Sequence, residues 1–548
     1  MHQSNAAPVT AVTDVLIIGA GPTGLILAHE LLRRSIRVRL VEKRPHPSST
    51  TRAFTLHART MEMFDHQGLA ARIDELREIC PGNLFHFKEM PLAKSQAPML
   101  DFRRLRNTRY NYYGKVNQND LDQALRESLA AKYSVYPEFG VEYIGSTQDT
   151  TGVTVHLQHT AAANREEITR AKWLVGADGA QSAVRGTLGT SFEQQDGQRM
   201  SMSMVDAQMS GFTGDAAWVN YFVSAKGFML VTGLPGQKYR LYLAGEMAQL
   251  LQHNSPLEAF QQGLDFFATG AQIERLEWSS SWEIRKIIGE TYRTGRILLC
   301  GDATHVHSPA GGQGMNACMQ DAFNLGWKLA LQIHGRAQAA ILDTYPAERR
   351  PIAEQVTAGA DRMHQILFNA TLAIEQRYQL TQDPSWHDEA IQQISALSHN
   401  YRGVDGAVAG ISLQADSVWP GDRAPDCGLS AAAPVRRLYD VLRHPGFTLL
   451  LIPGSNAATL QRCAELGRAI TRRFGRNVKP VVVHPTTVEG FDYDHTALDR
   501  SSELQHIYGA APEGQMIVVR PDLYVGFRGS LHAQAALDAY FSKWLIGE

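Results

Sequence analysis

The sequence predicts an α/β protein built from more than one domain. Three observations favour this fold class. Glycine-rich segments at residues 15–43, 173–186 and 296–330 each follow a short apolar run. Strand-like alternation fills the stretch between the last two segments. Beyond Pro420 the pattern changes to strands that alternate with helices, which is typical of a sheet covered by helices.

Composition excludes several classes of protein. The 548 residues are 44% hydrophobic and 20% charged, and 53 Lys and Arg against 55 Asp and Glu give a net charge of −2. A near-neutral chain without a basic block is unsuited to binding nucleic acid. The longest apolar runs, such as Phe447–Pro453, fall short of the ~18 residues that span a bilayer, so we expect no membrane span.

The N-terminus and the cysteines indicate the compartment. Residues Met1–Thr13 have neither a basic start nor a hydrophobic middle, which argues against a signal peptide. The five cysteines (Cys80, Cys300, Cys318, Cys427 and Cys463) have no CxxC spacing and are too sparse to cross-link a secreted fold. We therefore expect a soluble cytoplasmic protein.

The first glycine-rich segment has the features of a dinucleotide-binding turn. An apolar strand precedes the motif Gly19-Ala-Gly21-Pro-Thr-Gly24, and an amphipathic helix and a second strand ending in Glu42 follow it. Gly19 permits the tight turn, Gly21 lets the backbone approach a pyrophosphate, and Gly24 lets the helix pack on the strand. Glu42 can accept hydrogen bonds from ribose hydroxyls; the alternative is a solvated acid at a strand end. The segment predicts a Rossmann-like domain.

The other two segments indicate which dinucleotide is bound. A strand ends in Gly301-Asp302, where an acid can hold the ribityl hydroxyls of a flavin. A glycine loop and a long helix follow, and the helix N-terminus would direct its amides at the pyrimidine edge of the isoalloxazine ring. This stretch contributes Gly312, Gly314, Met315 and Asn316. The third segment places Asp178 after a strand and Arg185 on the helix that follows.

The three motifs, in this order and at these separations, resemble the single-component FAD-dependent aromatic hydroxylases, a family of flavoprotein monooxygenases. The resemblance covers essentially the whole chain. The segment around Arg52 resembles the arginine-bearing segment that lies near the flavin in this family, and Gln118 resembles its flavin-contacting glutamine.

The resemblance also implies a domain organisation. We expect a Rossmann-like FAD-binding domain interleaved with a β-sheet substrate domain, followed by a thioredoxin-like C-terminal domain. The boundaries are 1–186 and 290–370 for the FAD-binding domain, 187–289 for the substrate domain, 371–419 for a helical connection and 420–548 for the last domain. The last domain has no redox cysteine pair, so we expect a structural or assembly role, which leaves a homodimer open.

The activity implied by the resemblance uses the cofactor for the chemistry. NADPH (or NADH), a transient co-substrate, reduces FAD, and reduced FAD reacts with molecular oxygen to give a C4a-hydroperoxide that hydroxylates a phenolic substrate. Arg52 and Arg185 are candidates for contacting the nicotinamide cofactor or the flavin pyrophosphate; the alternative for each is an ordinary surface ion pair. One alternative is oxidation of, or Baeyer–Villiger insertion into, a polycyclic, polyketide-type aromatic. A non-catalytic binding protein is a second alternative, which the intact Asp302 and glycine loop disfavour.

The resemblance assigns the substrate pocket less directly. Tyr221 and Arg240 match the pocket-lining sheet and can hydrogen-bond a phenolate, and the cation lowers the pKa of the phenol. Pro309 is expected to present its carbonyl near the reacting hydroxyl. The alternative is that Tyr221 and Tyr242 only pack within the sheet.

Two further candidates are weaker. Tyr401 is a minor candidate for the pocket. His305 and His307 have an HxH spacing, but no third ligand cluster accompanies them, so we expect no metal site.

Overall fold

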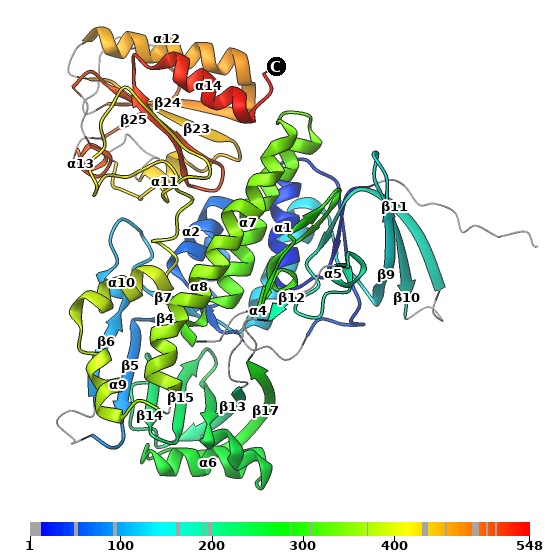
Figure 1. The fold of residues 1–548 in the computed structure, drawn as a ribbon, viewed down its shortest axis with the longest axis vertical. Helices are drawn as coiled ribbons and strands as arrows, with labels where there is room; N and C mark the ends of the chain where they lie inside the picture. Colours follow the sequence, from blue (N-terminus) through cyan, green and yellow to red (C-terminus); the bar gives the residue numbers. More distant parts are fainter. Residues whose placement is uncertain are drawn as a thin grey trace, which may run out of the picture.

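The computed structural model describes residues 13–48, 53–90, 96–160, 165–189, 192–194, 200–284, 287–306, 310–369, 371–429, 437–454, 457–484, 491, 493–499, 502–509 and 512–547. Within these residues a seven-stranded sheet lies at one end of the long axis and a C-terminal sheet at the other, with an eight-stranded sheet between them (Figure 1). No helix in these ranges is long and apolar enough to cross a membrane.

The eight-stranded sheet brings the three sequence motifs together. Its order is β19 (Arg293–Thr294), β20 (Ile297–Leu299), β11 (Arg165–Gly176), β1 (Thr13–Ile18), β2 (Val38–Glu42) and β8 (Glu138–Phe139), and β10 (Val153–His159) and β9 (Val141–Gln148) extend it beside β11. Strands β20, β11, β1 and β2 are parallel neighbours. Their carboxyl ends therefore meet at one edge of the sheet, where ligands bind in open α/β folds.

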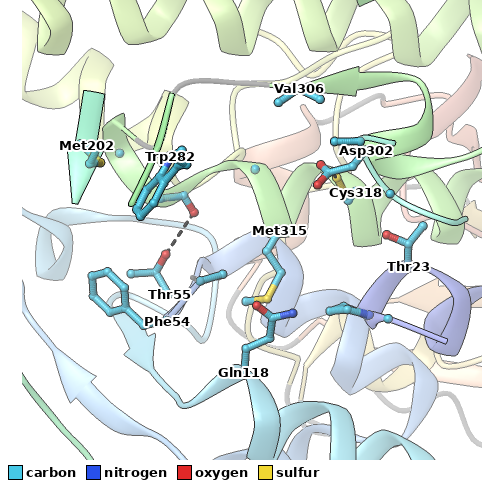
Figure 2. A pocket seen from close by; sticks show the side chains of 18 of the residues that line it. Thr23, Phe54, Thr55, Gln118, Met202, Trp282, Asp302, Val306, Met315 and Cys318 are labelled. Carbon is cyan, nitrogen blue, oxygen red and sulfur yellow. Dashed lines mark hydrogen bonds between the residues drawn. The ribbon is translucent and has the colours of Figure 1, made fainter. Parts of the chain in front are cut away.

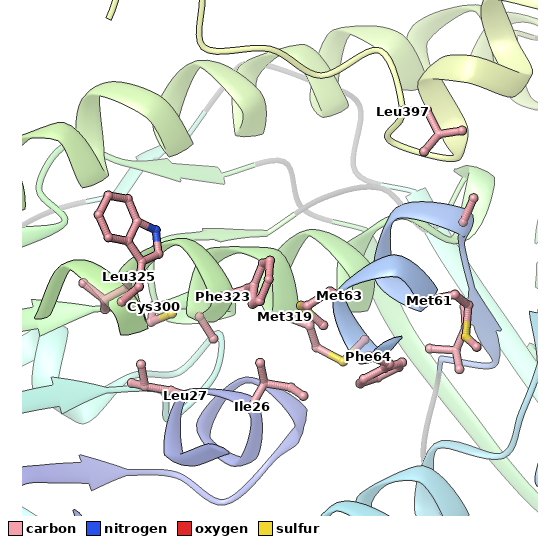
Figure 3. Close-up of a cluster of buried hydrophobic side chains, with 14 of the residues drawn as sticks. Ile26, Leu27, Met61, Met63, Phe64, Cys300, Met319, Phe323, Leu325 and Leu397 are labelled. Carbon is pink, nitrogen blue, oxygen red and sulfur yellow. The ribbon is translucent and has the colours of Figure 1, made fainter. Parts of the chain in front are cut away.

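Two helices cover this sheet beside the motifs. Helix α1 (Pro22–Leu32) connects β1 to β2, and helix α7 (Gly314–Ile333) packs along it. Gly326 permits the close approach, because a Cβ atom there would lie 2.4 Å from Cβ of Glu30. A buried cluster from α1, α7 and α2 (Ala58–Gln67) fills the space around them (Figure 3). Burial of each large apolar side chain contributes about 1.5–3 kcal/mol, which fixes the position of α7.

The seven-stranded sheet has two different faces. Its order is β17 (Gln272–Ile284), β13 (Met200–Ser210), β16 (Lys238–Gly245), β15 (Gly227–Leu234), β14 (Val219–Ser224), β5 (Gly82–Phe87) and β6 (Gln96–Asp101). Side chains of one face, among them Phe222, Met229 and Leu243, form a core with helix α6 (Pro256–Phe266). Side chains of the other face, among them Tyr221 and Tyr242, belong to the core of the molecule's centre.

Two strands of this sheet lie outside the residues that were expected to form the substrate domain. Strands β5 and β6 come from residues 82–101, which the sequence assigned to the FAD-binding domain, and β5 pairs in parallel with β14. Such pairing between distant segments leaves no local pattern in the sequence. Two small sheets complete this half: β3 (Thr55–Leu56), β7 (Tyr113–Lys115) and β4 (Glu78–Cys80), and β12 (Phe192–Gln194), β18 (Ile287–Gly289) and β21 (His305–Val306).

The C-terminal sheet has the chain order of a thioredoxin-like fold. The order across the sheet is β22 (Ala407–Ala409), β27 (Val525–Ser530), β26 (Gln515–Val519), β23 (Phe447–Ile452), β24 (Val478–His484) and β25 (Thr496–Leu498). Helix α12 (Ala457–Phe474) joins the parallel pair β23 and β24, and helix α14 (Gln534–Trp544) follows the antiparallel pair β26 and β27. Strand β22 lies before residue 420, so the sheet begins earlier than expected. The expected helical connection at 371–419 contains α9 (Ile374–Leu380) and α10 (Pro384–Ile394), and α8 (Thr344–Phe368) precedes it.

A buried ionic network ties the C-terminal sheet to α7 and α8. The Glu348 carboxylate accepts hydrogen bonds from Lys328 at 2.6 Å and from both terminal nitrogens of Arg520 at 2.7 and 2.8 Å. Asn324 donates to Glu348 and to Asp522. All five residues are at most 2% exposed. Removing one partner of such a network leaves a buried charge uncompensated and costs about 3–5 kcal/mol, so the two parts pack as a unit.

Candidate active site

A cavity of about 1060 Å³ lies between the eight-stranded and the seven-stranded sheet and is lined by residues from both sides. This volume is at the upper end of the range for small-molecule sites. Figure 2 shows Thr23, Asp302 and Cys318 on one side of the cavity, Trp282 and Met202 on the other, and Met315 with Gln118 between them. The first side lies at the carboxyl edge of the eight-stranded sheet, and the second belongs to the seven-stranded sheet. We call them the polar end and the aromatic end.

The glycine turn after β1 has the geometry that the motif predicts. Gly19 has φ +103°, and a Cβ atom there would lie 2.3 Å from the carbonyl oxygen of Ala177. A Cβ atom on Gly24 would lie 2.0 Å from the Gly19 carbonyl oxygen. Gly21 lines the cavity, and a Cβ atom there would meet nothing within 4 Å. The turn is therefore closed on the protein side and open on the cavity side.

Helix N-termini at the polar end are open toward the cavity. Gly21 precedes α1 and Gln313 precedes α7, and neither end is capped by a side chain of the described residues. Gly312, Gly314 and Met315 line the cavity around the start of α7. The free amides and the positive dipole ends of both helices favour negative charge in the space between them.

Asn316 holds this loop and is not among the described residues that line the cavity. Its amide donates to the carbonyl oxygens of Thr55 at 2.9 Å and Gly312 at 3.0 Å, and its Oδ1 accepts from the backbone N–H of His57 at 2.9 Å. Thr55 also donates to the Gly312 carbonyl at 3.0 Å. The Asn316 side chain is thus engaged within the loop, and its contact with a flavin stays a prediction.

Asp302 lies in the cavity, at the end of β20. Its carboxylate is exposed and accepts a hydrogen bond from the thiol of Cys318 at 3.1 Å. Burial, reinforced by the charge of Asp302, raises the pKa of the Cys318 thiol, so the thiol keeps its proton and continues to donate. The thiol thereby orients one oxygen atom of Asp302. A group that accepts hydrogen bonds from ribityl hydroxyls requires such an orientation.

The acids Glu42 and Asp178 hold backbone amides instead of lining the cavity. Glu42 accepts from the N–H groups of Ala20 at 3.1 Å and Arg44 at 3.0 Å, and from the Arg44 side chain at 2.9 Å. Arg44 and the two amides outweigh burial and lower the pKa of Glu42. Asp178 accepts from Ala183 and its neighbour at the start of α5 (Ala183–Thr187). Both acids stiffen the turns that border the polar end.

Arg185 and Gln118 line the polar end. Arg185 donates to the carbonyl oxygens of Ala303 at 2.9 Å and Ala180 at 2.8 Å, which leaves its side chain fixed beside Asp302. Gln118 begins helix α4 (Gln118–Tyr133), and Asp122, one turn further along, also lines the cavity. The sequence reasoning did not single out Asp122. Its position four residues after Gln118 places both on one helix face, and that spacing is the signal that could have indicated it.

The aromatic end is built on one rung of the seven-stranded sheet. Tyr221, Leu230 and Tyr242 lie opposite one another on β14, β15 and β16, and all three line the cavity. Phe85 stacks on Tyr221 with the ring centroids 5.4 Å apart. Burial raises the pKa of Tyr221, so its hydroxyl stays protonated. Trp282 and Met202 on the next rung also line the cavity and were not predicted.

Arg240 is placed differently from the prediction. It is 1% exposed, is not among the described lining residues, and forms a two-pronged ion pair with Asp206 at 2.7 Å. It also donates to the Ala53 carbonyl at 3.2 Å and hydrogen-bonds the Tyr242 side chain. Because Asp206 lies directly opposite on β13, the guanidinium is engaged within the sheet. Its effect on a bound ligand would pass through Tyr242.

Several predicted residues fall elsewhere. Arg52, His307 and Pro309 lie outside the described residues. His305 is buried, and its ring hydrogen-bonds Asp321 at 2.7 Å. Asp321 also accepts a hydrogen bond from Arg349. Tyr401 is not among the described residues that line the cavity. Its hydroxyl accepts a hydrogen bond from Arg349 at 3.0 Å, and its ring packs on Tyr524.

Comparisons with known proteins agree with this arrangement. Residues 12–360 match the FAD binding domain family and residues 417–546 match the aromatic-ring hydroxylase C-terminal family. The chain is 37% identical to pentachlorophenol 4-monooxygenase of Sphingobium chlorophenolicum, covering 97% of this chain and 96% of the relative. It is 29% identical to 6-methylpretetramide 4-monooxygenase of Streptomyces rimosus, covering 96% and 92%.

Solved structures give the same result. The structure of anhydrotetracycline hydroxylase from Streptomyces rimosus superposes with a TM-score of 0.73 at 27% identity, covering 97% of this chain and 99% of that one. A flavin-dependent monooxygenase solved with FAD and substrate has the same fold, with a TM-score of 0.77 at 21% identity, covering 98% of this chain and all of that one. The resemblance inferred from the motifs is confirmed, and this chain belongs to the family of FAD-dependent aromatic-ring monooxygenases.

Proposed function

We propose that this protein uses NADPH or NADH, bound FAD and molecular oxygen to hydroxylate a phenolic aromatic compound. The observation that carries the proposal is the continuity of the cavity. Its polar end, bordered by two uncapped helix N-termini, opens directly into an aromatic end lined by Tyr221 and Tyr242. A cofactor and an aromatic ring would therefore meet in one continuous cavity.

The residues of the polar end fit FAD. The open side of Gly21 leaves room for a pyrophosphate against the amides of α1, and Asp302 offers an oriented acceptor for ribityl hydroxyls. The N-terminus of α7, at Gly314 and Met315, would face the pyrimidine edge of the ring and stabilise negative charge there. When bound, FAD supplies the transfer of electrons from the nicotinamide cofactor and the activation of oxygen.

The residues of the aromatic end would position the substrate. Tyr242 lines the cavity, and its oxygen accepts a hydrogen bond from Arg240, which cannot itself accept; we assign its O–H as a donor to a bound substrate. Tyr221 offers a second protonated hydroxyl on the same rung. Donors at the phenolic oxygen favour the phenolate, which is the more electron-rich ring. The apolar walls, which include Phe228 and Leu230, exclude water from the reacting atoms.

A polycyclic aromatic is the second candidate for the substrate. The full-length similarity to anhydrotetracycline hydroxylase and the large cavity favour it, whereas the higher identity to pentachlorophenol 4-monooxygenase favours a single phenolic ring. Oxidation or Baeyer–Villiger insertion on such a polycyclic compound is the corresponding alternative reaction.

A substrate screen tests the proposal. FAD-loaded protein is incubated with NADPH or NADH and a panel of phenols, halophenols and polycyclic phenols, and nicotinamide oxidation and product mass are recorded. We expect one class to accelerate nicotinamide oxidation and to yield a product with one added oxygen atom or a displaced ring substituent. If no aromatic compound accelerated oxidation in the FAD-loaded protein, the proposal would be wrong.

A further inference from the structure

Asp122 is an unusual residue of the polar end. It lines the cavity from the face of α4 that it shares with Gln118, and it is 6% exposed. The buried residues of α4 that accompany it are all apolar: Leu121, Ala124, Leu125 and Leu129. Charged residues are seldom buried without a partner. Its Oδ1 atom is nevertheless buried without a hydrogen-bond partner among the described residues.

The Gln118 side chain hydrogen-bonds the carboxyl group of Asp122, and the other neighbours explain why its Oδ1 atom has no partner among the described residues. Arg44 is a cation from outside α4 whose charge acts on Asp122, but its guanidinium donates to Glu42 at 2.9 Å. Arg126, on the same helix, and Arg44 influence Asp122 only through their charge. On α1, the His29 ring hydrogen-bonds the Leu125 carbonyl. Burial lowers the pKa of His29 to about 4, so this ring stays neutral at physiological pH.

The protonation state follows from these neighbours. Burial, the largest influence, raises the pKa of Asp122 to about 7; Arg126, Arg44 and Gln118 lower it, and Glu42 raises it. A phosphate group placed nearby would add negative charge and raise this pKa further. A protonated carboxyl group is a hydrogen-bond donor, whereas a carboxylate only accepts. The cavity beside the glycine turn thus contains a group that changes from acceptor to donor as the local negative charge increases.

We propose that Asp122 contacts FAD as a protonated acid and donates a hydrogen bond to an oxygen atom of the cofactor's pyrophosphate–ribose segment. The segment is indicated by position, because Glu42, whose charge acts on Asp122, also accepts from the N–H of Ala20 in the glycine turn. Binding of FAD would then take up one proton from solvent above neutral pH. This inference rests on FAD binding at the polar end and adds a residue and a pH dependence to it.

The first experiment compares FAD affinity with pH. The dissociation constant of FAD is measured on the full-length apoprotein from pH 6 to 9 for the wild type, Asp122→Asn and Asp120→Asn. Asp120 lies two residues earlier on the same helix but is exposed and accepts from Asn117, so it is a matched control. We expect the wild-type and Asp120→Asn affinities to fall about tenfold per pH unit above 7. Asparagine keeps a donor without titrating, so the ratio of Asp122→Asn to wild-type affinity should rise with pH.

The second experiment needs no variant. Calorimetric titration of wild-type apoprotein with FAD at pH 8, in buffers of different ionisation enthalpy, gives the number of protons taken up. We expect uptake approaching one proton per FAD at pH 8 and almost none at pH 6. FAD binding without proton uptake, or the same pH profile for wild type and Asp122→Asn, would overturn the role of Asp122. Failure of the wild type to bind FAD at any pH would instead contradict the proposed function.

Discussion

Two strand-to-helix connections of this molecule each contain a glycine directly after a buried strand or its turn, and the two glycines have opposite surroundings. After β1 the turn at Gly21 leads into α1, and after β23 the turn at Gly454 leads toward α12. A Cβ atom on Gly21 would meet nothing within 4 Å, whereas one on Gly454 would lie 1.9 Å from the carbonyl oxygen of Pro512. The first glycine leaves room for a ligand, and the second leaves room for the protein's own backbone.

The difference shows why a glycine at such a turn is ambiguous in a sequence. Both turns follow a buried strand and contain a glycine, but the protein's own packing requires the absence of a side chain only at Gly454. Among the described residues, the N-terminal turn is accompanied by further polar groups that line the same cavity, namely Asp302 after the parallel strand β20 and Gln118 at the start of α4. A binding site therefore requires several strand ends that converge on open space.

Substitution of the two glycines should separate binding from stability. Gly21→Val is expected to leave the melting temperature of the apoprotein nearly unchanged, because Gly21 has an ordinary φ of −79° and open space beside it. It should weaken FAD binding more than about a hundredfold, since it displaces at least two backbone donors to a charged group, each contributing roughly 1.5–3 kcal/mol. FAD fluorescence titration and thermal unfolding measure both effects.

Gly454→Ala is the matched control for that change. Its Cβ atom would overlap a backbone carbonyl, so we expect a loss of about 1–3 kcal/mol of stability, with FAD affinity retained in the folded fraction. If Gly454→Ala abolished FAD binding, or if Gly21→Val bound FAD as tightly as the wild type, the contrast between the two turns would be wrong.

Asp302→Ala should have the next largest effect. Loss of the acceptor leaves ribityl hydroxyls of FAD and the thiol of Cys318 without a partner, which costs about 1–3 kcal/mol, or roughly 5- to 150-fold in FAD affinity. Asp302→Asn keeps one acceptor oxygen and should lose less. Equal affinity of Asp302→Ala and the wild type in an FAD titration would remove Asp302 from the binding site.

Tyr242→Phe should have a smaller effect, confined to the substrate. Removal of one neutral donor costs about 0.5–1.5 kcal/mol, which corresponds to a two- to tenfold rise in KM or in uncoupled NADPH oxidation, without loss of FAD. Tyr239→Phe is the control, because Tyr239 lies on the opposite face of β16 against Phe212. The ratio of product formed to NADPH oxidised should change in the first variant only; the same change in both would assign Tyr242 to packing.

Substitution of the cysteines of the C-terminal part should have the smallest effect on turnover. Burial raises the pKa of Cys427, and it raises that of Cys463 to about 12, so neither thiol is a reactive thiolate at neutral pH. Replacement of both by alanine should leave substrate-dependent NADPH oxidation unchanged within error. Loss of turnover with full FAD content would show instead that this part of the chain takes part in electron transfer.

The motifs that are local in sequence were the predictable part of the site. Gly19, Gly24 and Asp302 could be placed because each follows an apolar strand, and parallel strands bring their carboxyl ends together. The roles of Glu42 and Asp178 could not be resolved, since an acid at a strand end can face a ligand or a backbone amide. Here both accept from backbone amides.

Long-range pairing limited the remaining predictions. Arg240 was assigned to the substrate because it matches the pocket-lining sheet of the family and a guanidinium can hydrogen-bond a phenolate. Its partner Asp206 lies 34 residues away, and only the register of β13 and β16 brings the two together. The same limit applies to strands β5 and β6, whose place in the seven-stranded sheet depends on pairing with β14. Periodicity identifies a strand but not its neighbour.

Transfer of oxygen from labelled O₂ tests the central claim most directly. FAD-loaded protein, NADPH and the best phenol of the screen are incubated under isotopically labelled O₂ in ordinary water, and the product is analysed by mass spectrometry. The account predicts that each product molecule carries one labelled oxygen atom in a new hydroxyl group. A product whose new oxygen comes from water, or labelled hydrogen peroxide with unchanged phenol, would contradict the assignment as a monooxygenase.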